Sequence, residues 1–239
     1  IHFGQFPTED IARKTYLFRT TGLGISNIAS LFMVMGYPYD SDEARNLAAG
    51  LVSLLTAQSY LVSSMMAKKV GPFEKFNINK EHMLRVIRNH CRVSGALVDD
   101  YEGLNYKPVG INHEILIKCN LGNISEKVKK TWISALKAGE EYGYRNAQVS
   151  VIAPTGTISF AMDCGATSIE PFFSHIVYKK LSGGGFMTVI NPVIEIALQN
   201  LGYTPEQIKD ILDYILRSEK VKNGPIEYEK VLDGKIEGA

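Results

Sequence analysis

The chain has 239 residues, with 26 Lys and Arg residues against 25 Asp and Glu residues and a formal net charge of +1. Hydrophobic residues make up 45% and charged residues 21%, an ordinary composition for a soluble globular protein. This near-neutral charge provides no bulk attraction for nucleic acid or for an anionic membrane surface, so neither is predicted as a partner. The longest apolar run, residues 25–35, is interrupted by polar residues and is too short to span a bilayer.

The cysteines and histidines do not form a recognisable metal or disulfide pattern. Cys91, Cys119 and Cys164 are widely spaced and odd in number, which suits a reducing, cytoplasmic setting, and we predict that they do not pair with each other. The five histidines sit at no metal-ligand spacing, so no metal is predicted. No signal peptide is visible. Because the sequence starts at Ile1 rather than at a methionine, we expect a fragment or a processed product.

The first 93 residues predict four helices. Thr8 can cap the first of them, and Glu9 and Asp10 follow in its first turn, where carboxylates favour the positive end of the helix dipole. Gly22 and Gly36 end the first two helices, as C-terminal glycines do. The third helix is rich in Ala and Leu, which indicates burial on more than one side. The four are predicted over residues 7–21, 26–35, 41–68 and 79–93.

The pattern changes after residue 93. Residues 94–122 contain several glycines and a proline and have weak periodicity, so they are predicted to be a loop. A short β-branched run at residues 147–153 predicts a buried strand, and residues 172–181 predict a second strand. Residues 204–207 form a capping box with proline at the first helical position. Further helices are predicted over residues 125–142, 191–202 and 204–217, and the polar tail 218–239 is predicted to be flexible. With no repeat or linker visible, residues 1–239 are predicted to be a single helix-rich α/β domain.

One segment carries a chemical signal: the turn made of Pro154, Thr155, Gly156, Thr157, Ile158 and Ser159, between a predicted strand and a short predicted helix. Such a turn presents backbone N–H groups and hydroxyls at a helix N-terminus, where the helix dipole favours an anion. Gly156 would allow the backbone to approach a phosphate closely. The alternative is an ordinary turn in which Thr155 or Thr157 only caps the helix. The local pattern leaves both interpretations open.

Other candidate sites are weaker. Residues 22–27 imitate a dinucleotide-binding fingerprint, but Asn27 replaces the third glycine, and a helix rather than a strand is predicted before them. We interpret their glycines as sites of close helix packing. Cys164 follows the turn and is interpreted as a small buried hydrophobic residue rather than a reactive thiol. A basic cluster is interpreted as a solvated helix face; its members are Arg85, Arg88 and Arg92.

Several of these segments resemble, in order along residues 4–217, the part of adenosylcobalamin-dependent (class II) ribonucleotide reductases that follows the active-site cysteine. The segments that carry the resemblance are Gln5-Phe6-Pro7, Arg19-Thr20-Thr21-Gly22-Leu23-Gly24, Met33-Val34-Met35-Gly36-Tyr37-Pro38-Tyr39-Asp40-Ser41-Asp42-Glu43, Met83-Leu84-Arg85-Val86-Ile87-Arg88-Asn89-His90, Gly143-Tyr144-Arg145-Asn146-Ala147-Gln148, Ala153-Pro154-Thr155-Gly156-Thr157-Ile158, Ser168-Ile169-Glu170-Pro171 and Lys179-Lys180-Leu181-Ser182-Gly183-Gly184-Gly185.

The resemblance implies a ten-stranded α/β barrel built from two five-stranded halves, of which this chain would be the C-terminal part. It also implies conversion of ribonucleotides to deoxyribonucleotides. In such enzymes, homolysis of the cobalt–carbon bond of adenosylcobalamin generates a thiyl radical on a finger-loop cysteine, and that radical removes the ribose 3′ hydrogen. Two further cysteines supply the reducing electrons as the 2′ hydroxyl leaves.

The family's finger-loop motif, Asn-x-Cys-x-Glu, and its redox cysteines precede the segment that matches Gln5-Phe6-Pro7, so no catalytic residue is assigned in this chain. The turn of residues 154–159 matches the turn that holds the substrate phosphates, and residues 169–171 resemble a segment on the barrel wall near the site. Anchoring remote phosphates helps to position the sugar, while the cofactor supplies the difficult bond-breaking step.

Two functions are therefore open. The first is the substrate-anchoring portion of a ribonucleotide reductase, whose partners are the ribonucleotide and the N-terminal part of the catalytic subunit. On this hypothesis the isolated chain is inactive and prone to form homo-oligomers. The second is a non-catalytic helical binding or interaction module derived from the same fold. The coding sequence upstream of Ile1 discriminates them, because a finger-loop cysteine followed two residues later by glutamate supports the enzyme. The sequence does not decide between a di- and a triphosphate substrate.

Overall fold

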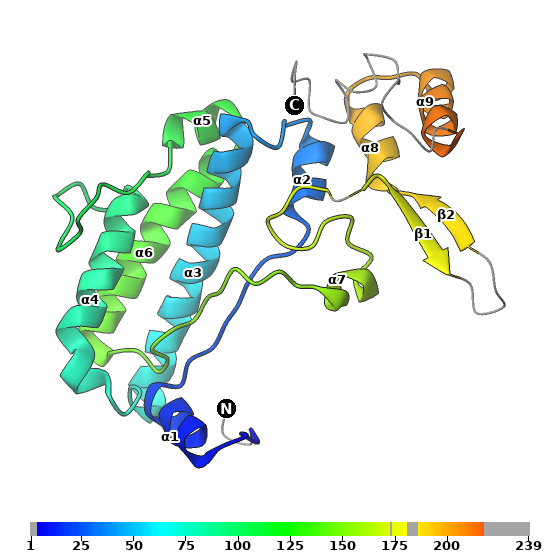
Figure 1. Ribbon diagram of the computed structural model, residues 1–239. Helices are drawn as coiled ribbons and strands as arrows, with labels where there is room; N and C mark the ends of the chain where they lie inside the picture. Colours follow the sequence, from blue (N-terminus) through cyan, green and yellow to red (C-terminus); the bar gives the residue numbers. More distant parts are fainter. Residues whose placement is uncertain (1–3, 173, 181–185, 218–239) are drawn as a thin grey trace. The chain divides into compact units, whose positions relative to one another are not determined.

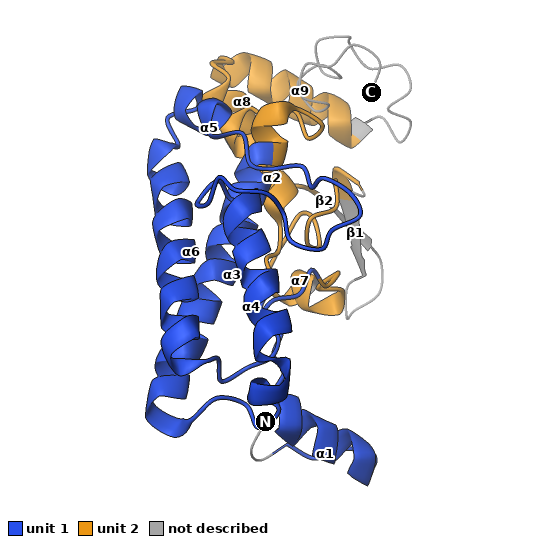
Figure 2. Cartoon of the chain, turned by 90° about the vertical axis from the view of Figure 1, so that its left-hand side faces the viewer, with its two compact units in different colours: residues 1–24, 46–152 blue, residues 25–45, 153–239 orange. Residues whose placement is uncertain are grey.

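The computed structural model of the protein describes residues 4–172, 174–180 and 186–217. Most of the described elements are helices, which confirms the helix-rich prediction (Figure 1). The chain divides into two compact units, shown in different colours in Figure 2. Unit 1 comprises residues 1–24 and 46–152, and unit 2 comprises residues 25–45 and 153–239.

The helices of unit 1 lie close to their predicted positions, with the exception of α5 (His113–Lys118), which was not predicted. The others are α1 (Glu9–Phe18), α4 (Phe76–Val93), α6 (Gly122–Tyr142) and, from residue 46 onward, α3 (Asp42–Val70). Thr8 caps α1 as predicted, since its hydroxyl accepts a hydrogen bond from the Ile11 N–H at 3.3 Å. This helix ends three residues earlier than predicted because Arg19 adopts a left-handed conformation with φ of 50°.

Aromatic side chains form much of the unit 1 core. Trp132 and Tyr144 are almost completely buried, and the ring of Tyr60 packs edge-on against Tyr144 with ring centroids 5.4 Å apart. The polar atoms of both buried rings have partners. The Tyr144 hydroxyl donates to the Ala135 carbonyl at 2.9 Å, and Trp132 Nε1 donates to Ser53 Oγ at 2.8 Å. This core therefore combines apolar burial with satisfied hydrogen bonds.

Helix α3 is, by its length of 29 residues and its composition, apolar enough to cross a membrane, although the sequence prediction had considered only residues 25–35. The core helix of a soluble protein passes the same test. Ala57 and Tyr60 of α3 belong to the core described above. The length and composition of α3 are thus weak evidence for a membrane span.

The predicted loop over residues 94–122 is wrong in its last part, which contains α5. Asn112 caps this helix, because its Oδ1 accepts hydrogen bonds from the N–H groups of Glu114 and Ile115 at 3.1 and 3.3 Å. Only six residues are helical. Such a segment is too short for hydrophobic periodicity to reveal it.

The predicted strand at residues 147–153 pairs with residues 21–23 but forms only a single parallel bridge, between Leu23 and Ser150. The Leu23 N–H donates to the Val149 carbonyl, and the Val151 N–H donates to the Leu23 carbonyl, both at 2.9 Å. This segment is therefore extended as predicted, yet it is too briefly paired to count as a strand. It was also predicted to be buried, whereas Val151 and Ile152 are 47% and 57% exposed.

Glycine allows this pairing. A Cβ atom added at Gly22 would lie 2.7 Å from Val151 Cγ1, and one added at Gly24 would lie 2.6 Å from the Val151 carbonyl oxygen. Close approach of two extended segments, and not the helix packing that we predicted, is the reason for these glycines. The dinucleotide-binding interpretation fails as expected, since α1 rather than a strand precedes them.

Unit 2 combines short helices with one hairpin. Its elements are α2 (Ile28–Met35), α7 (Thr157–Ala161), β1 (Ile176–Lys180), β2 (Phe186–Ile190), α8 (Val193–Asn200) and α9 (Pro205–Arg217). The predicted capping box is confirmed: the Gln207 N–H donates to Thr204 Oγ1 at 3.3 Å, and the Thr204 N–H donates to Gln207 Oε1 at 2.9 Å. A second core lies between α8 and α9; its buried members are Ile194, Leu198, Ile208 and Ile215.

The strand prediction for residues 172–181 is right only in part, because β1 begins at Ile176 and pairs antiparallel with β2, which was not predicted. In the described part of the chain this hairpin is the only sheet, so the barrel strands implied by the resemblance are not observed there. The tail predicted to be flexible, 218–239, lies outside the described residues.

Candidate functional site

The predicted phosphate-binding turn, residues 154–159, leads into α7 in unit 2. Two consecutive residues have left-handed backbone conformations, with φ of 58° at Thr155 and 64° at Gly156. The Gly156 N–H donates to the Pro154 carbonyl at 2.5 Å, which closes a three-residue turn. A Cβ atom at Gly156 would meet nothing within 4 Å, so the space beside the turn is open. Pro154, Gly156, Thr157 and Ile158 are exposed and Thr155 is half-buried.

Ser159 differs from the other residues of the turn. It is buried, its hydroxyl donates to the Gly156 carbonyl at 2.6 Å, and its N–H approaches the same oxygen at 3.1 Å. As placed, Ser159 stabilises the turn from the inside. The hydroxyls of Thr155 and Thr157 have no hydrogen-bond partner recorded within the described residues, so they remain available to an external ligand.

A second segment of unit 2, residues 166–170, contains part of the segment that the resemblance places near the site, and side chains fix it. Glu170 Oε2 accepts hydrogen bonds from Thr167 Oγ1 and from the Ser168 N–H, both at 2.8 Å. The pKa of Glu170 is therefore lowered, chiefly by backbone hydrogen bonds. The Tyr39 hydroxyl donates to the Ile169 carbonyl, and burial raises the pKa of Tyr39. Glu170 thus acts here as an anchored carboxylate that orders its own loop.

Asn27 holds the beginning of this segment. Its Oδ1 accepts from the Ala166 N–H at 3.0 Å, and its own N–H donates to the Thr167 carbonyl at 3.2 Å. Asn27 has φ of 61°, a left-handed conformation that asparagine tolerates better than most residues. One feature of the sequence could have indicated this conformation: Asn27 occupies the position of the third glycine in the dinucleotide-binding fingerprint, and glycine readily adopts a left-handed conformation.

The three cysteines are free thiols. Cys91 is buried, which raises the pKa of its thiol to about 12 and disfavours the reactive thiolate. Cys164 is half-buried, so its interpretation as a buried hydrophobic residue is only partly right. Among the residues that the structure describes, no group of three or more His, Cys, Asp and Glu side chains could hold a metal ion.

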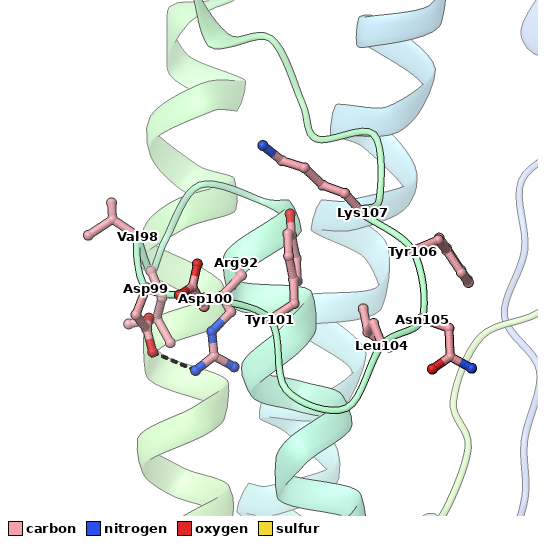
Figure 3. Close-up of a pocket in the computed structure, with 10 residues that line it drawn as sticks. Arg92, Val98, Asp99, Asp100, Tyr101, Leu104, Asn105, Tyr106 and Lys107 are labelled. Atoms are coloured by element: carbon pink, nitrogen blue, oxygen red, sulfur yellow. Dashed lines mark hydrogen bonds and ion pairs between the residues drawn. The ribbon is translucent and has the colours of Figure 1, made fainter.

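A cavity of about 740 Å³ lies in unit 1 and not at the turn (Figure 3). Its lining comes from Arg92 on α4 and from the connection to α5, with Asp100, Tyr101 and Lys107 among the polar side chains. Arg92 Nε is buried and has no hydrogen-bond partner within the described residues, but an atom without solvent exposure is not accessible to a ligand in the cavity. The cavity therefore offers no built binding site.

An ion-pair network fixes the connection between α4 and α5. It corrects the prediction of a solvated basic face for Arg88 and Arg92, while Arg85 is exposed as predicted. Arg88 binds Glu102 with two hydrogen bonds, Nε to Oε1 and Nη2 to Oε2, each 2.7 Å long. Arg92 is only 6% exposed and pairs with Glu102 at 2.7 Å and with Asp99 at 2.5 Å. The arginines are therefore structural clamps, and their acidic partners lie in a segment without periodicity.

We expect the Glu102→Gln substitution to loosen this connection. The guanidinium groups of Arg88 and then Arg92 lower the pKa of Glu102 from 4.5 to about 2. Because the folded pKa is lowered, the stabilisation is present above pH 4.5 and is lost as the pH falls toward 2. The protection factors of residues 95–112, which correct for the pH dependence of intrinsic amide exchange, should therefore fall in wild type between pH 4.5 and 2. In the variant they should be low already at pH 7.

Glu81→Gln is the matched control, since Glu81 also pairs with Arg88 but is 78% exposed. An exposed pair contributes little, so this control should exchange like wild type. Equal exchange in the Glu102 and Glu81 variants would contradict the clamp.

Comparisons with known proteins agree with the resemblance found in the sequence. The family model for the ribonucleotide reductase barrel domain matches residues 1–232. A vitamin B12-dependent ribonucleotide reductase of Agrobacterium fabrum is 43% identical over 225 residues, covering 94% of this chain and 18% of that protein. Another from Streptantibioticus cattleyicolor is 37% identical over 227 residues, covering 94% of this chain and 35% of that protein.

A more distant relative is the ribonucleoside-diphosphate reductase subunit alpha of Chlamydia pneumoniae, which is 27% identical over 228 residues. These residues are 93% of this chain and 20% of that protein. The chain thus spans only 18–35% of the length of these three relatives. Since the family match covers almost its whole length, the chain belongs to the ribonucleotide reductase family, within the barrel domain and alongside the vitamin B12-dependent members.

Proposed function

We propose that this chain is the substrate-anchoring portion of the catalytic subunit of a vitamin B12-dependent ribonucleotide reductase, a cytoplasmic oxidoreductase that converts ribonucleotides to deoxyribonucleotides. The observation that carries the proposal is the family match over residues 1–232, which includes the exposed turn at residues 154–159. The substrate is a ribonucleoside di- or triphosphate. The radical and reducing cysteines would belong to the part of the subunit that precedes this segment.

The turn would hold the substrate phosphates through Thr155 and Thr157. Their hydroxyls are available as donors, and the open space beside Gly156 lets an anion reach the backbone. The N–H groups at the start of α7 add a favourable dipole. Residues 154–159 include no Lys or Arg, so we expect the turn alone to bind phosphate weakly.

In the whole enzyme, adenosylcobalamin would supply the radical that converts a cysteine thiol to a thiyl radical. A cavity of about 590 Å³ beside α9 and the one of about 740 Å³ in unit 1 are both within the range of drug-sized ligand sites. Neither is large enough to enclose a corrinoid with its adenosyl group. We therefore assign no cobalamin contact to this chain and derive no step through the cofactor.

The remainder of the subunit would complete the barrel as part of one domain. In unit 1 the paired segments at residues 21–23 and 148–151 leave Leu23, Val151 and Ile152 between 47% and 57% exposed. Parallel sheets are normally buried on both faces, so an isolated parallel pair needs further strands beside it. We propose that N-terminal strands of the same polypeptide pair here, and that the uncovered edges make the isolated chain prone to self-association.

The Thr157→Val substitution tests the turn, because valine keeps the shape and removes the hydroxyl. We expect wild type to bind pyrophosphate with millimolar affinity and the variant to bind roughly 3- to 10-fold more weakly, as expected for one lost hydrogen bond. The measurement is a two-dimensional NMR titration that follows the amides of residues 155–160.

Thr204→Val is the control. It removes a threonine hydroxyl from the capping box of α9, in the same unit but outside the turn. The affinity of Thr204→Val for pyrophosphate should equal that of wild type. Equal binding by both variants would show that Thr157 does not contact the phosphate, and no binding by wild type would refute anchoring by this chain alone.

A further inference from the structure

We propose that Asn27 is a positioning residue for the phosphate-binding turn, an inference that rests on the function proposed for residues 154–159. Asn27 does not belong to the turn and precedes it by more than a hundred residues. Its side chain, however, fixes the point at which the chain returns from the turn. Asn27 is thus placed to control where the hydroxyls of Thr155 and Thr157 are presented.

The bonds around Asn27 tie α2 to the returning segment. Its Oδ1 accepts from the Ala166 N–H at 3.0 Å and from Ser30 Oγ at 2.5 Å, so one oxygen joins the first turn of the helix to that segment. Next to it, the Ile28 N–H donates to the Ser168 carbonyl at 3.1 Å, and Ser168 Oγ donates to the Ile25 carbonyl at 2.9 Å. Ala166 and Ser168 are buried, which makes these bonds costly to lose.

The connection from Ala166 to the turn is short and is held by hydrogen bonds at both ends. The Cys164 N–H donates to the Ser159 carbonyl at 2.9 Å, so Gly165 is the single residue between that bond and the Asn27 contact. Gly165 packs closely against its neighbours, because a Cβ atom there would lie 2.6 Å from both Asn191 Nδ2 and Phe172 Cε1. A displacement of Ala166 would therefore be passed on to Ser159.

Three substitutions separate the side chain of Asn27 from its backbone conformation. Asn27→Gly keeps the left-handed conformation without strain but removes Oδ1. Asn27→Ala removes Oδ1 and also disfavours that conformation. Asn27→Asp keeps both the conformation and an acceptor oxygen. Asn200→Ala is the control, because it removes one bond between α8 and α2, from Nδ2 to the Val34 carbonyl at 2.8 Å.

The experiment uses the full 239-residue chain, with pyrophosphate as the probe. We expect Asn27→Gly and Asn27→Ala to raise the dissociation constant about 10-fold, the effect of losing one well-placed buried hydrogen bond on a positioned group. The dissociation constants of Asn27→Asp and Asn200→Ala should stay within about 2-fold of the wild-type value, well below that effect. Amide exchange at residues 164–168 should be faster only in the Gly and Ala variants.

The outcomes are distinct. Wild-type affinity in Asn27→Gly would overturn the positioning role while leaving phosphate binding by the turn intact. A parallel loss in Asn200→Ala would reduce Asn27 to a general stabiliser of unit 2 and would also overturn the proposal. If wild type binds no pyrophosphate, the proposed function of the chain fails, and the exchange at residues 164–168 still decides whether Asn27 holds the loop.

Discussion

The purified chain, mixed with adenosylcobalamin, dithiothreitol and a ribonucleotide, should yield no deoxyribonucleotide above the protein-free control. The reaction needs a thiol held within a few ångströms of the ribose 3′ carbon, and positioning of this kind contributes up to about 7–11 kcal/mol to a barrier. Cys91 lies fully buried in the core of unit 1, so it cannot contact a ribose. A dissolved thiol cannot replace such geometry. Chromatography of the nucleosides after dephosphorylation is the measurement.

A full-length vitamin B12-dependent ribonucleotide reductase, assayed under the same conditions, is the positive control for cofactor and reductant. Cys164→Ala is the informative variant, because Cys164 is the half-buried thiol that follows the turn. Product from wild type that disappears in this variant would show that Cys164 is catalytic and that the chain is more than an anchoring portion. Product from both would point to a contaminating enzyme.

The Gly139→Ala substitution should lower the free energy of unfolding of unit 1 by roughly 2–4 kcal/mol. A Cβ atom at residue 139 would overlap the hydroxyl and Cζ of Tyr144, which is fully buried and donates to the Ala135 carbonyl. Displacing a buried aromatic ring costs about 3–5 kcal/mol, and the better helix propensity of alanine offsets about 1 kcal/mol of this. Urea unfolding followed by the fluorescence of Trp132, the single tryptophan, measures the change.

Gly122→Ala, at the start of the same helix, is the control. A Cβ atom there would lie 3.7 Å from Ile117 Cγ1, an ordinary contact, so this variant should be as stable as wild type or slightly more so. Tyr144→Ala should remove the steric conflict, so the double variant should be more stable than the sum of the two single changes predicts. Equal stability of Gly139→Ala and wild type would mean that Tyr144 is not packed against α6 in this way.

The sequence by itself determined most of the helices and the family. Thr8 and the box at residues 204–207 act on neighbours three residues away, and they cap helices as predicted. Gly36 ends α2 with φ of 70°, again a local property of the residue. Features that depend on residues within one or two turns of each other can be identified from the sequence, because the interacting groups are close in the chain.

Segments without periodicity were understood only from the structure. Residues 94–122 resemble a plain loop in sequence, yet Glu102 is bound by two arginines of α4 and α5 follows after it. An acidic residue in a loop carries no signal of its partner. The wrong prediction that Arg92 is solvated has the same origin. A basic helix face is usually solvated, and the burial of Arg92 depends on where the following segment of the chain crosses α4.

For the candidate site, the six residues of the turn at 154–159 could be identified from their composition and from the resemblance, and their role in phosphate binding stays a prediction. What holds the turn could not be identified in that way. Asn27 binds Ala166 across 139 positions of sequence, and Leu23 pairs with Val151 across more than a hundred. Such contacts exist only once the chain has brought distant segments together, and pairing between distant residues depends on topology rather than on local composition. The sequence therefore determined which residues are candidates for binding an anion, and the tertiary structure decided which distant residues contact the segments beside them.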